Sequence, residues 1–136
     1  GGIDFMSGVM ADTQCYDIAA EEFRQPNVDL GPLPEPWWGI ADGWQFTNGE
    51  YQIWLANGVD KDGVLLPASA YASESSGGFH YGPMLPEALY RLEGDGWNGQ
   101  FFTVGGSSVG FETTNLVHNL TQCPECYRVF TPLLTR

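Results

Sequence analysis

The sequence predicts a mainly β fold, an antiparallel β-sandwich or barrel-like single domain with one or two short helices. Short segments rich in aromatic and β-branched residues are separated by turn signals. Glycine and proline are frequent, with 18 and 9 among 136 residues, and no repeat orders them. The two segments with helical character are too short to provide the crossovers of a parallel sheet. One domain, residues 1–136, fits this length.

The N-terminal part predicts one helix and one extended segment. Residues 17–24 are expected to form a short helix, with Asp17 as its N-cap and Arg24 near its C-terminal end. Residues 26–36 are expected to be extended, because their four prolines exclude a helix and a central strand.

The strongest local prediction is a β-hairpin around Asn48-Gly49, a pair typical of a type I′ turn. A two-residue loop sets the pairs Thr47–Glu50, Phe46–Tyr51, Gln45–Gln52 and Trp44–Ile53. One face then holds Trp44, Phe46, Tyr51 and Ile53. The other face holds Gln45, Thr47, Glu50 and Gln52, and Trp54 lies on it opposite Gly43.

The rest of the chain predicts further strands, one more helix and turns. Proline at its first position and Gly94 beyond its end favour a helix over residues 86–92. Turns are expected at residues 75–78 and 95–99. The expected strands cover residues 64–66, 70–72, 100–104, 109–114 and 127–131. Asp42-Gly43-Trp44 and Asp95-Gly96-Trp97 resemble each other, but two short copies do not establish a repeat.

The charge of the chain excludes several partners. Seventeen acidic residues against five basic ones give a net charge of −12. A nucleic-acid-binding protein uses Lys and Arg to replace phosphate counterions, so no nucleic-acid partner is expected. Anionic membrane surfaces are disfavoured for the same reason. No apolar run is long enough for a membrane helix, so no membrane insertion is expected.

Three cysteines and one sequon favour an extracytoplasmic location. A disulfide from Cys15 to Cys123 or Cys126 is expected, ahead of a redox motif or of a zinc site at Cys123 and Cys126 with His118. Cys15 or His80 would complete that zinc site. Asn119-Leu120-Thr121 is the only N-glycosylation sequon. With these features, the near absence of lysine predicts a secreted or surface protein.

Two motifs that resemble functional sites are better explained as turns. Gly106-Ser107-Ser108-Val109-Gly110 matches G-x-S-x-G, but the strand-like residues after it do not fit a nucleophile elbow. Asp60 and Asp62 could contribute to a loose calcium site, although the loop lacks the bidentate glutamate of an EF-hand. No catalytic residue and no cofactor are assigned.

The tryptophans are the most suggestive feature for function. Exposed rings beside Gln and Glu suit stacking on a sugar ring, so the candidates for ligand stacking are Trp37, Trp38, Trp54 and Trp97. The alternative is packing, since aromatics on both faces of a strand are typical of a doubly buried sheet or an interface.

Three functions follow from these alternatives. The first is an extracellular or surface binding module, with carbohydrate as its candidate ligand. The second is a structural or assembly subunit that binds protein surfaces, with a homo-oligomer as one form. The third is a small hydrolase that uses an acid pair; an enzyme is the least favoured of the three.

Overall fold

The computed structural model describes residues 1–120 and the backbone of residues 128–130, and it is nearly all β. Every strand pair is antiparallel. The strands are β1 (Gly2–Asp4), β2 (Gly8–Met10), β3 (Tyr16–Asp17), β4 (Glu22–Phe23), β5 (Ala41–Thr47), β6 (Glu50–Ala56), β7 (Ser69–Ser73), β8 (His80–Tyr81), β9 (Glu93–Trp97), β10 (Gln100–Val104), β11 (Val117–Leu120) and β12 (Arg128–Phe130). No helix in the described part is long and apolar enough to cross a membrane.

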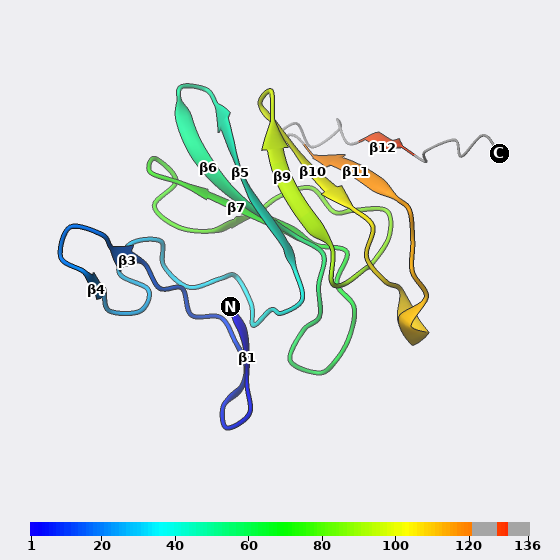
Figure 1. Cartoon of the computed structure of the whole chain (residues 1–136), viewed down its shortest axis with the longest axis horizontal. Helices are drawn as coiled ribbons and strands as arrows, with labels where there is room; N and C mark the ends of the chain where they lie inside the picture. The colour runs from blue at the N-terminus through cyan, green and yellow to red at the C-terminus, as the bar shows by residue number, and fades with distance from the viewer. Residues whose placement is uncertain (121–127, 131–136) are drawn as a thin grey trace.

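Two four-stranded sheets form the body of the protein. Their strand orders are β5-β6-β7-β8 and β12-β11-β10-β9, and the sheets meet along β5 and β9 (Figure 1). Between them lies a core that includes Trp54 from one sheet and Phe101 and Leu120 from the other. Each sheet keeps its own ladder of hydrogen bonds, so the arrangement is an open sandwich and not a closed barrel.

The predicted hairpin around Asn48-Gly49 is confirmed. β5 and β6 pair from Ala41↔Ala56 to Thr47↔Glu50, in the predicted register. Asn48 and Gly49 have φ values of 53° and 84°, as a type I′ turn requires. Asn98-Gly99 repeats this turn between β9 and β10, with φ values of 52° and 73°. The expected turn at residues 95–99 is therefore limited to these two residues.

Three glycines allow β5 and β9 to touch backbone to backbone. A Cβ on Gly43 would lie 2.8 Å from the Cα of Asp95, and one on Gly94 would lie 2.9 Å from the carbonyl oxygen of Asp42. A Cβ on Gly96 would collide with the carbonyl group of Trp44. The close contact of the two edge strands therefore depends on the absence of side chains at these positions.

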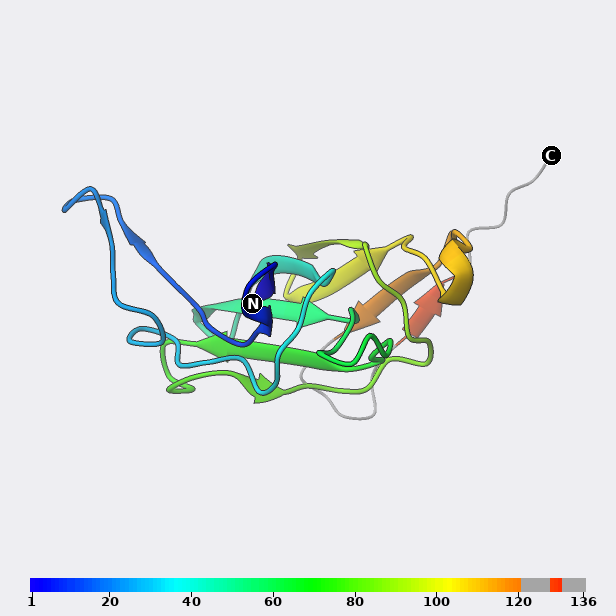
Figure 2. The same ribbon diagram turned by 90° about the horizontal axis from the view of Figure 1, so that it is seen from below.

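The N-terminal segment covers part of the outer face of the β5–β8 sheet. Its β1–β2 and β3–β4 hairpins lie beside the sheets, and β3–β4 projects away from them (Figure 2). Residues 26–36 contain neither helix nor strand. Leu33 and Trp37 lie in a second buried cluster with Leu55 and Ala70 of the sheet. This sheet is therefore buried on both faces along part of its length.

Both predicted helices are wrong. Residues 17–24 contain the β3–β4 hairpin, and the Asp17 carboxylate accepts hydrogen bonds from Ala19 and Ala20 N–H in the turn. Asp17 thus caps a turn and not a helix. In residues 86–92 the backbone pairs with other segments, since Tyr90 exchanges hydrogen bonds with Ser107 and Arg91 donates to Gly39. These long-range bonds replace the local bonds of a helix.

The remaining strand predictions have mixed outcomes. Strands are confirmed within residues 70–72, 100–104 and 127–131, where β7, β10 and β12 lie. Residues 64–66 form only an isolated bridge, between Leu65 and Val59. The strand predicted over residues 109–114 is wrong, because positive φ values at Gly110 and Phe111 interrupt it and a short 3-10 helix, η1 (Val109–Phe111), forms there.

Candidate functional site

The polar face of the β5–β6 hairpin is buried between the sheets. Gln45 and Gln52 are 4% and 1% exposed, and Trp54 is fully buried. The Gln52 side-chain oxygen accepts hydrogen bonds from Gln45 Nε2 at 3.0 Å and from Trp54 Nε1 at 3.1 Å. The Trp54 ring stacks between Tyr71 and Phe101. These two hydrogen bonds offset part of the cost of burying the face, while the buried Gln45 Oε1 has no hydrogen-bond partner among the described residues.

The aromatic face of the same hairpin is exposed near the turn. Trp44, Phe46 and Tyr51 are 58%, 55% and 66% exposed. Phe46 and Tyr51 pair across the strands with ring centroids 5.0 Å apart in an edge-to-face arrangement. Trp44 pairs with Ile53, and Ile53 pairs with Ala72 of β7. Trp44, Phe46 and Tyr51 therefore form an exposed apolar surface, whereas Ile53 is half-buried and Ala72 is buried.

A groove of about 730 Å³ adjoins this surface, and we call it the Trp44–Tyr51 groove. The hairpin supplies Trp44, Tyr51 and Ile53, while the other walls come from the N-terminal segment and from β7 with its following turn. Those walls consist of Cys15, Asp29, Leu30, Ala72, Ser73, Glu74 and Gly77. The volume lies in the range of pockets that hold small ligands.

Glu50 accepts hydrogen bonds from the turn after β7, which forms one wall of the groove. The Glu50 carboxylate accepts hydrogen bonds from Ser75 Oγ at 2.9 Å and from Ser75 N–H at 3.3 Å. These bonds lower the pKa of Glu50, and so this carboxylate stays ionised. Glu74, which precedes Ser75, is exposed and lines the groove.

Asp29 and Cys15 form the wall from the N-terminal segment. Arg24 pairs with Asp29 at 2.6 Å and neutralises part of its charge. Burial raises the pKa of the Cys15 thiol, and the nearby Asp29 carboxylate raises it further. Cys15 therefore presents a neutral, weakly nucleophilic thiol to the groove.

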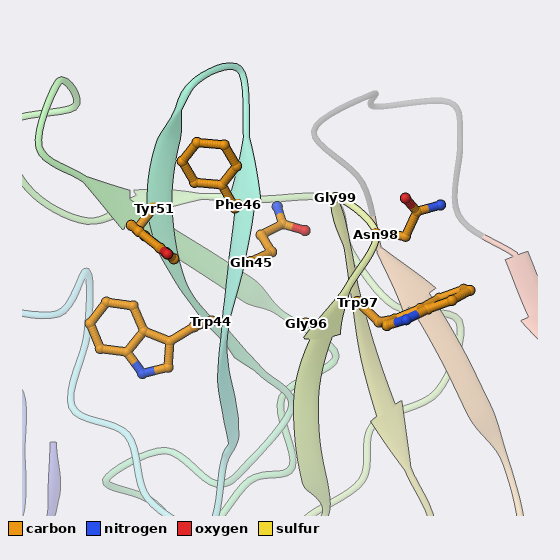
Figure 3. Close-up of a pocket in the computed structure, with 8 residues that line it drawn as sticks. All are labelled: Trp44, Gln45, Phe46, Tyr51, Gly96, Trp97, Asn98 and Gly99. Atoms are coloured by element: carbon orange, nitrogen blue, oxygen red, sulfur yellow. The ribbon is translucent and has the colours of Figure 1, made fainter.

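A second hollow, of about 500 Å³, lies between the tips of the two Asn-Gly hairpins. Trp44 and Tyr51 line it together with Trp97 and Asn98. Figure 3 shows the Trp44 and Tyr51 rings on one side of the hairpin tips and the Trp97 ring on the other. A single ligand ring therefore cannot stack on Trp44 and Trp97 together.

The four residues predicted to stack on a ligand differ in their exposure to solvent. Trp37 and Trp54 are fully buried, so their predicted exposure is wrong and the alternative of core packing holds for both. Trp38 is half-buried, with its ring edge-to-face to Tyr90 at 6.3 Å. Trp97 is 72% exposed at the tip of β9. Of the four, only Trp97 lines a hollow described above, the one between the hairpin tips.

The cysteine and sequon predictions are corrected in part. Cys15 is a free thiol, so the disulfide predicted for it is wrong. Strand β3, which begins directly after Cys15, lies at the opposite end of the molecule from β12 (Figure 1). Cys123 and Cys126 lie outside the described residues. Asn119 is 6% exposed and its Nδ2, the atom that a glycan would occupy, donates to Gln100 Oε1 at 3.1 Å. The predicted glycosylation site is therefore buried.

Asp60, Asp62 and His118, which are predicted as possible metal ligands, form hydrogen bonds or an ion pair with protein groups. Asp60 accepts hydrogen bonds from Asp62 N–H and Val64 N–H within its turn, and Asp62 pairs with Lys61 at 2.6 Å. His118 is buried, with Nδ1 3.1 Å from Thr103 Oγ1, and burial lowers its pKa. Among residues 1–120, no three His, Cys, Asp or Glu side chains come together as metal ligands would.

The G-x-S-x-G motif lies in a loop with isolated bridges, and η1, not the expected strand, begins at its Val109. Ser107 forms isolated bridges with Tyr90 and with Thr113, and η1 follows it. The Ser108 hydroxyl lies 3.5 Å from two backbone carbonyl oxygens, of Val109 and Glu112. No strand–turn–helix elbow is present at this position.

Local sequence patterns place Trp44 and Tyr51 on one hairpin face but favour Trp54, on the other face, for stacking. The rings that line the groove are therefore missed by sequence reasoning. The sequence feature that indicates the buried face is the position of three glycines in the strands. Gly43, Gly94 and Gly96 lie in β5 and β9, where missing side chains indicate close approach of another backbone. That signal would have placed the glutamine face inside.

Comparison with known proteins adds no relative to this description. No protein-family model matches the chain, and no curated protein sequence matches it. The candidate site is therefore interpreted from its own residues.

Proposed function

We propose that the protein is an extracellular or surface-located binding module that binds carbohydrate in the Trp44–Tyr51 groove. The single observation behind this proposal is the exposure of Trp44 and Tyr51 beside a concave space of about 730 Å³. Aromatic rings cover the C–H face of a sugar, while carboxylates and hydroxyls bind its hydroxyl groups. Asp29, Ser73 and Glu74 supply such groups at the groove.

The concave shape favours a small ligand over a flat protein surface. The groove has walls from three separate segments, and its floor includes the half-buried Ile53. The proposed location outside the cytoplasm rests on composition, with one lysine and many glycine and aromatic residues. The acid-pair hydrolase gains no support from residues 1–120, because the carboxyl groups there with a shifted pKa, Asp4 and Glu50, have it lowered, opposite to a general acid.

Titration with soluble oligosaccharides, followed by tryptophan fluorescence and calorimetry, tests the proposal. Trp44→Ala and Tyr51→Ala should each weaken binding about tenfold, because each removes one stacking ring. Trp97→Ala is the matched control, since this exposed tryptophan lies on the other side of the hairpin tips. A panel of neutral, cationic and acidic glycans with no binder, or equal losses in all three variants, would contradict the proposal.

The N-terminal hairpins support a second candidate function, self-assembly. Five apolar side chains at their turns and strands are more than 60% exposed: Ile3 at 61%, Phe5 at 107%, Met6 at 93%, Ile18 at 84% and Phe23 at 65%. A group of exposed apolar side chains is typical of a protein–protein interface. Sedimentation should then show a concentration-dependent oligomer that Phe5→Ser with Met6→Ser disrupts. A monomer at all concentrations would remove this candidate.

A further inference from the structure

The rim of the Trp44–Tyr51 groove carries negative charge. Asp29 lies in the wall from the N-terminal segment and Glu74 in the wall from the turn after β7, and no Lys, Arg or His is among the residues that line the groove. Arg24 pairs with Asp29. The Glu74 carboxylate is exposed and has no ion-pair partner among residues 1–120. Glu74 is therefore the strongest local charge available to a ligand.

The charge of the whole chain acts in the same direction. A net charge of −12 attracts cations toward the protein and repels anions. The faces of Trp44 and Tyr51 are also electron-rich, and a cation above such a face is attracted to it. A ligand with a positive group would therefore gain from the rings and from Glu74 together, whereas a carboxylate on the ligand would meet repulsion.

Resting on the proposed function, we infer that the groove selects glycans that carry a protonated primary amine. The model ligand is a β-linked glucosamine oligomer. Its N-acetylated form has the same sugar ring and linkage but no positive charge, so the two forms differ in the feature that Glu74 would recognise. A polyuronate presents the same kind of ring with a negative charge.

The experiment compares these three oligomers at equal length by calorimetry, with the intact protein at a pH where the amine is protonated. The glucosamine oligomer should bind about tenfold more tightly than its N-acetylated form, through one exposed ion pair and one cation–π contact. Glu74→Gln should remove most of this preference. Glu112→Gln, an exposed charge change beside η1 and outside the groove residues, should retain it.

Each outcome separates the inference from the proposed function. Binding of the N-acetylated oligomer as tightly as the amine form would overturn the inference and leave the carbohydrate proposal standing. Equal loss of preference in both Glu variants would overturn it too, since the overall charge and not Glu74 would then be responsible. Tightest binding of the polyuronate would also overturn it. If none of the three binds and no glycan in the wider panel does, the proposed function itself fails.

Discussion

One face of the β5–β6 hairpin is polar and buried, while the other is aromatic and exposed near the turn. On the first face, the Gln52 oxygen accepts two hydrogen bonds beneath a stack of aromatic rings. On the second, Trp44 and Tyr51 keep more than half of their surface in contact with solvent. Hydrogen bonds offset the cost of burying amides, whereas exposed rings contribute little burial. The buried face therefore explains stability, and the exposed face is where binding is proposed.

Trp54→Ala should have the largest effect on this contrast. Trp54 is fully buried, and its ring centroid lies 5.1 Å from that of Tyr71 and 6.0 Å from that of Phe101. Truncation therefore leaves a cavity in the core between the sheets. We expect a loss of about 3–5 kcal/mol in the free energy of unfolding. Urea unfolding followed by far-UV circular dichroism measures it. Trp97→Ala is the control and should change stability by less than about 0.5 kcal/mol; similar losses in both would contradict the assigned burial.

Gly96→Ala should come next, because it separates β5 from β9. The new methyl group would collide with the carbonyl group of Trp44, and backbone cannot yield as a flexible side chain does. We expect a loss of about 3 kcal/mol. Gly110→Ala serves as the control, since Gly110 has open space and only its φ of 80° disfavours alanine, at a cost of about 1–2 kcal/mol. A smaller loss at Gly96 than at Gly110 would contradict the close crossing.

Gln52→Leu tests the hydrogen bonds of the buried face. It leaves Gln45 Nε2 and Trp54 Nε1 without their shared acceptor, and unpaired buried donors are costly. We expect a loss of about 2 kcal/mol in the free energy of unfolding. Gln45→Leu removes only one of the two donors and should cost less. In a double-mutant cycle the two changes should couple by about 1 kcal/mol, and strict additivity would show that the glutamines do not interact.

The hairpin register could be predicted from sequence because two independent local signals agreed. Asn48-Gly49 determines the turn, and the alternation of side chains determines the faces. Which face lies inside depends on distant residues. Gly94 and Gly96 of β9 allow β5 of the other sheet to approach closely. Leu33 and Trp37 cover only part of the outer face of the β5–β8 sheet. Local polarity alone therefore does not determine which face lies in the core.

The predicted helices failed for a related reason. The residues favour a helix locally, but long-range partners supply other hydrogen bonds. Tyr90 N–H donates to Ser107, and Gly58 N–H donates to Leu89, so residues 86–92 are tied to segments on both sides. Leu85, Leu89 and Leu92 fill the core in this extended form. Tertiary packing outweighs a helix propensity of a few tenths of a kcal/mol per residue.

The groove could not be found from sequence, because its walls are far apart along the chain. Cys15 and Asp29 meet Trp44 and Glu74 only after the N-terminal segment crosses the sheet. The sequence did identify the residue type, exposed aromatic rings, but it selected Trp54 because its neighbours were polar. Polar neighbours indicate exposure only when they are not already hydrogen-bonded to one another, as Gln45 and Gln52 are.

Trp44→Thr should have the smallest effect on stability and thereby sharpens the comparison of the two faces. Threonine keeps the β-propensity of the strand while removing the exposed ring. Because Trp44 is 58% exposed, we expect the free energy of unfolding to change by less than about 1 kcal/mol. Urea unfolding followed by circular dichroism gives this value, and glycan titration of the same sample gives the affinity. Lost binding with retained stability would assign the exposed face to ligand recognition. A loss as large as that of Trp54→Ala would instead show that Trp44 supports the fold, and the test of stacking would then depend on Tyr51 alone.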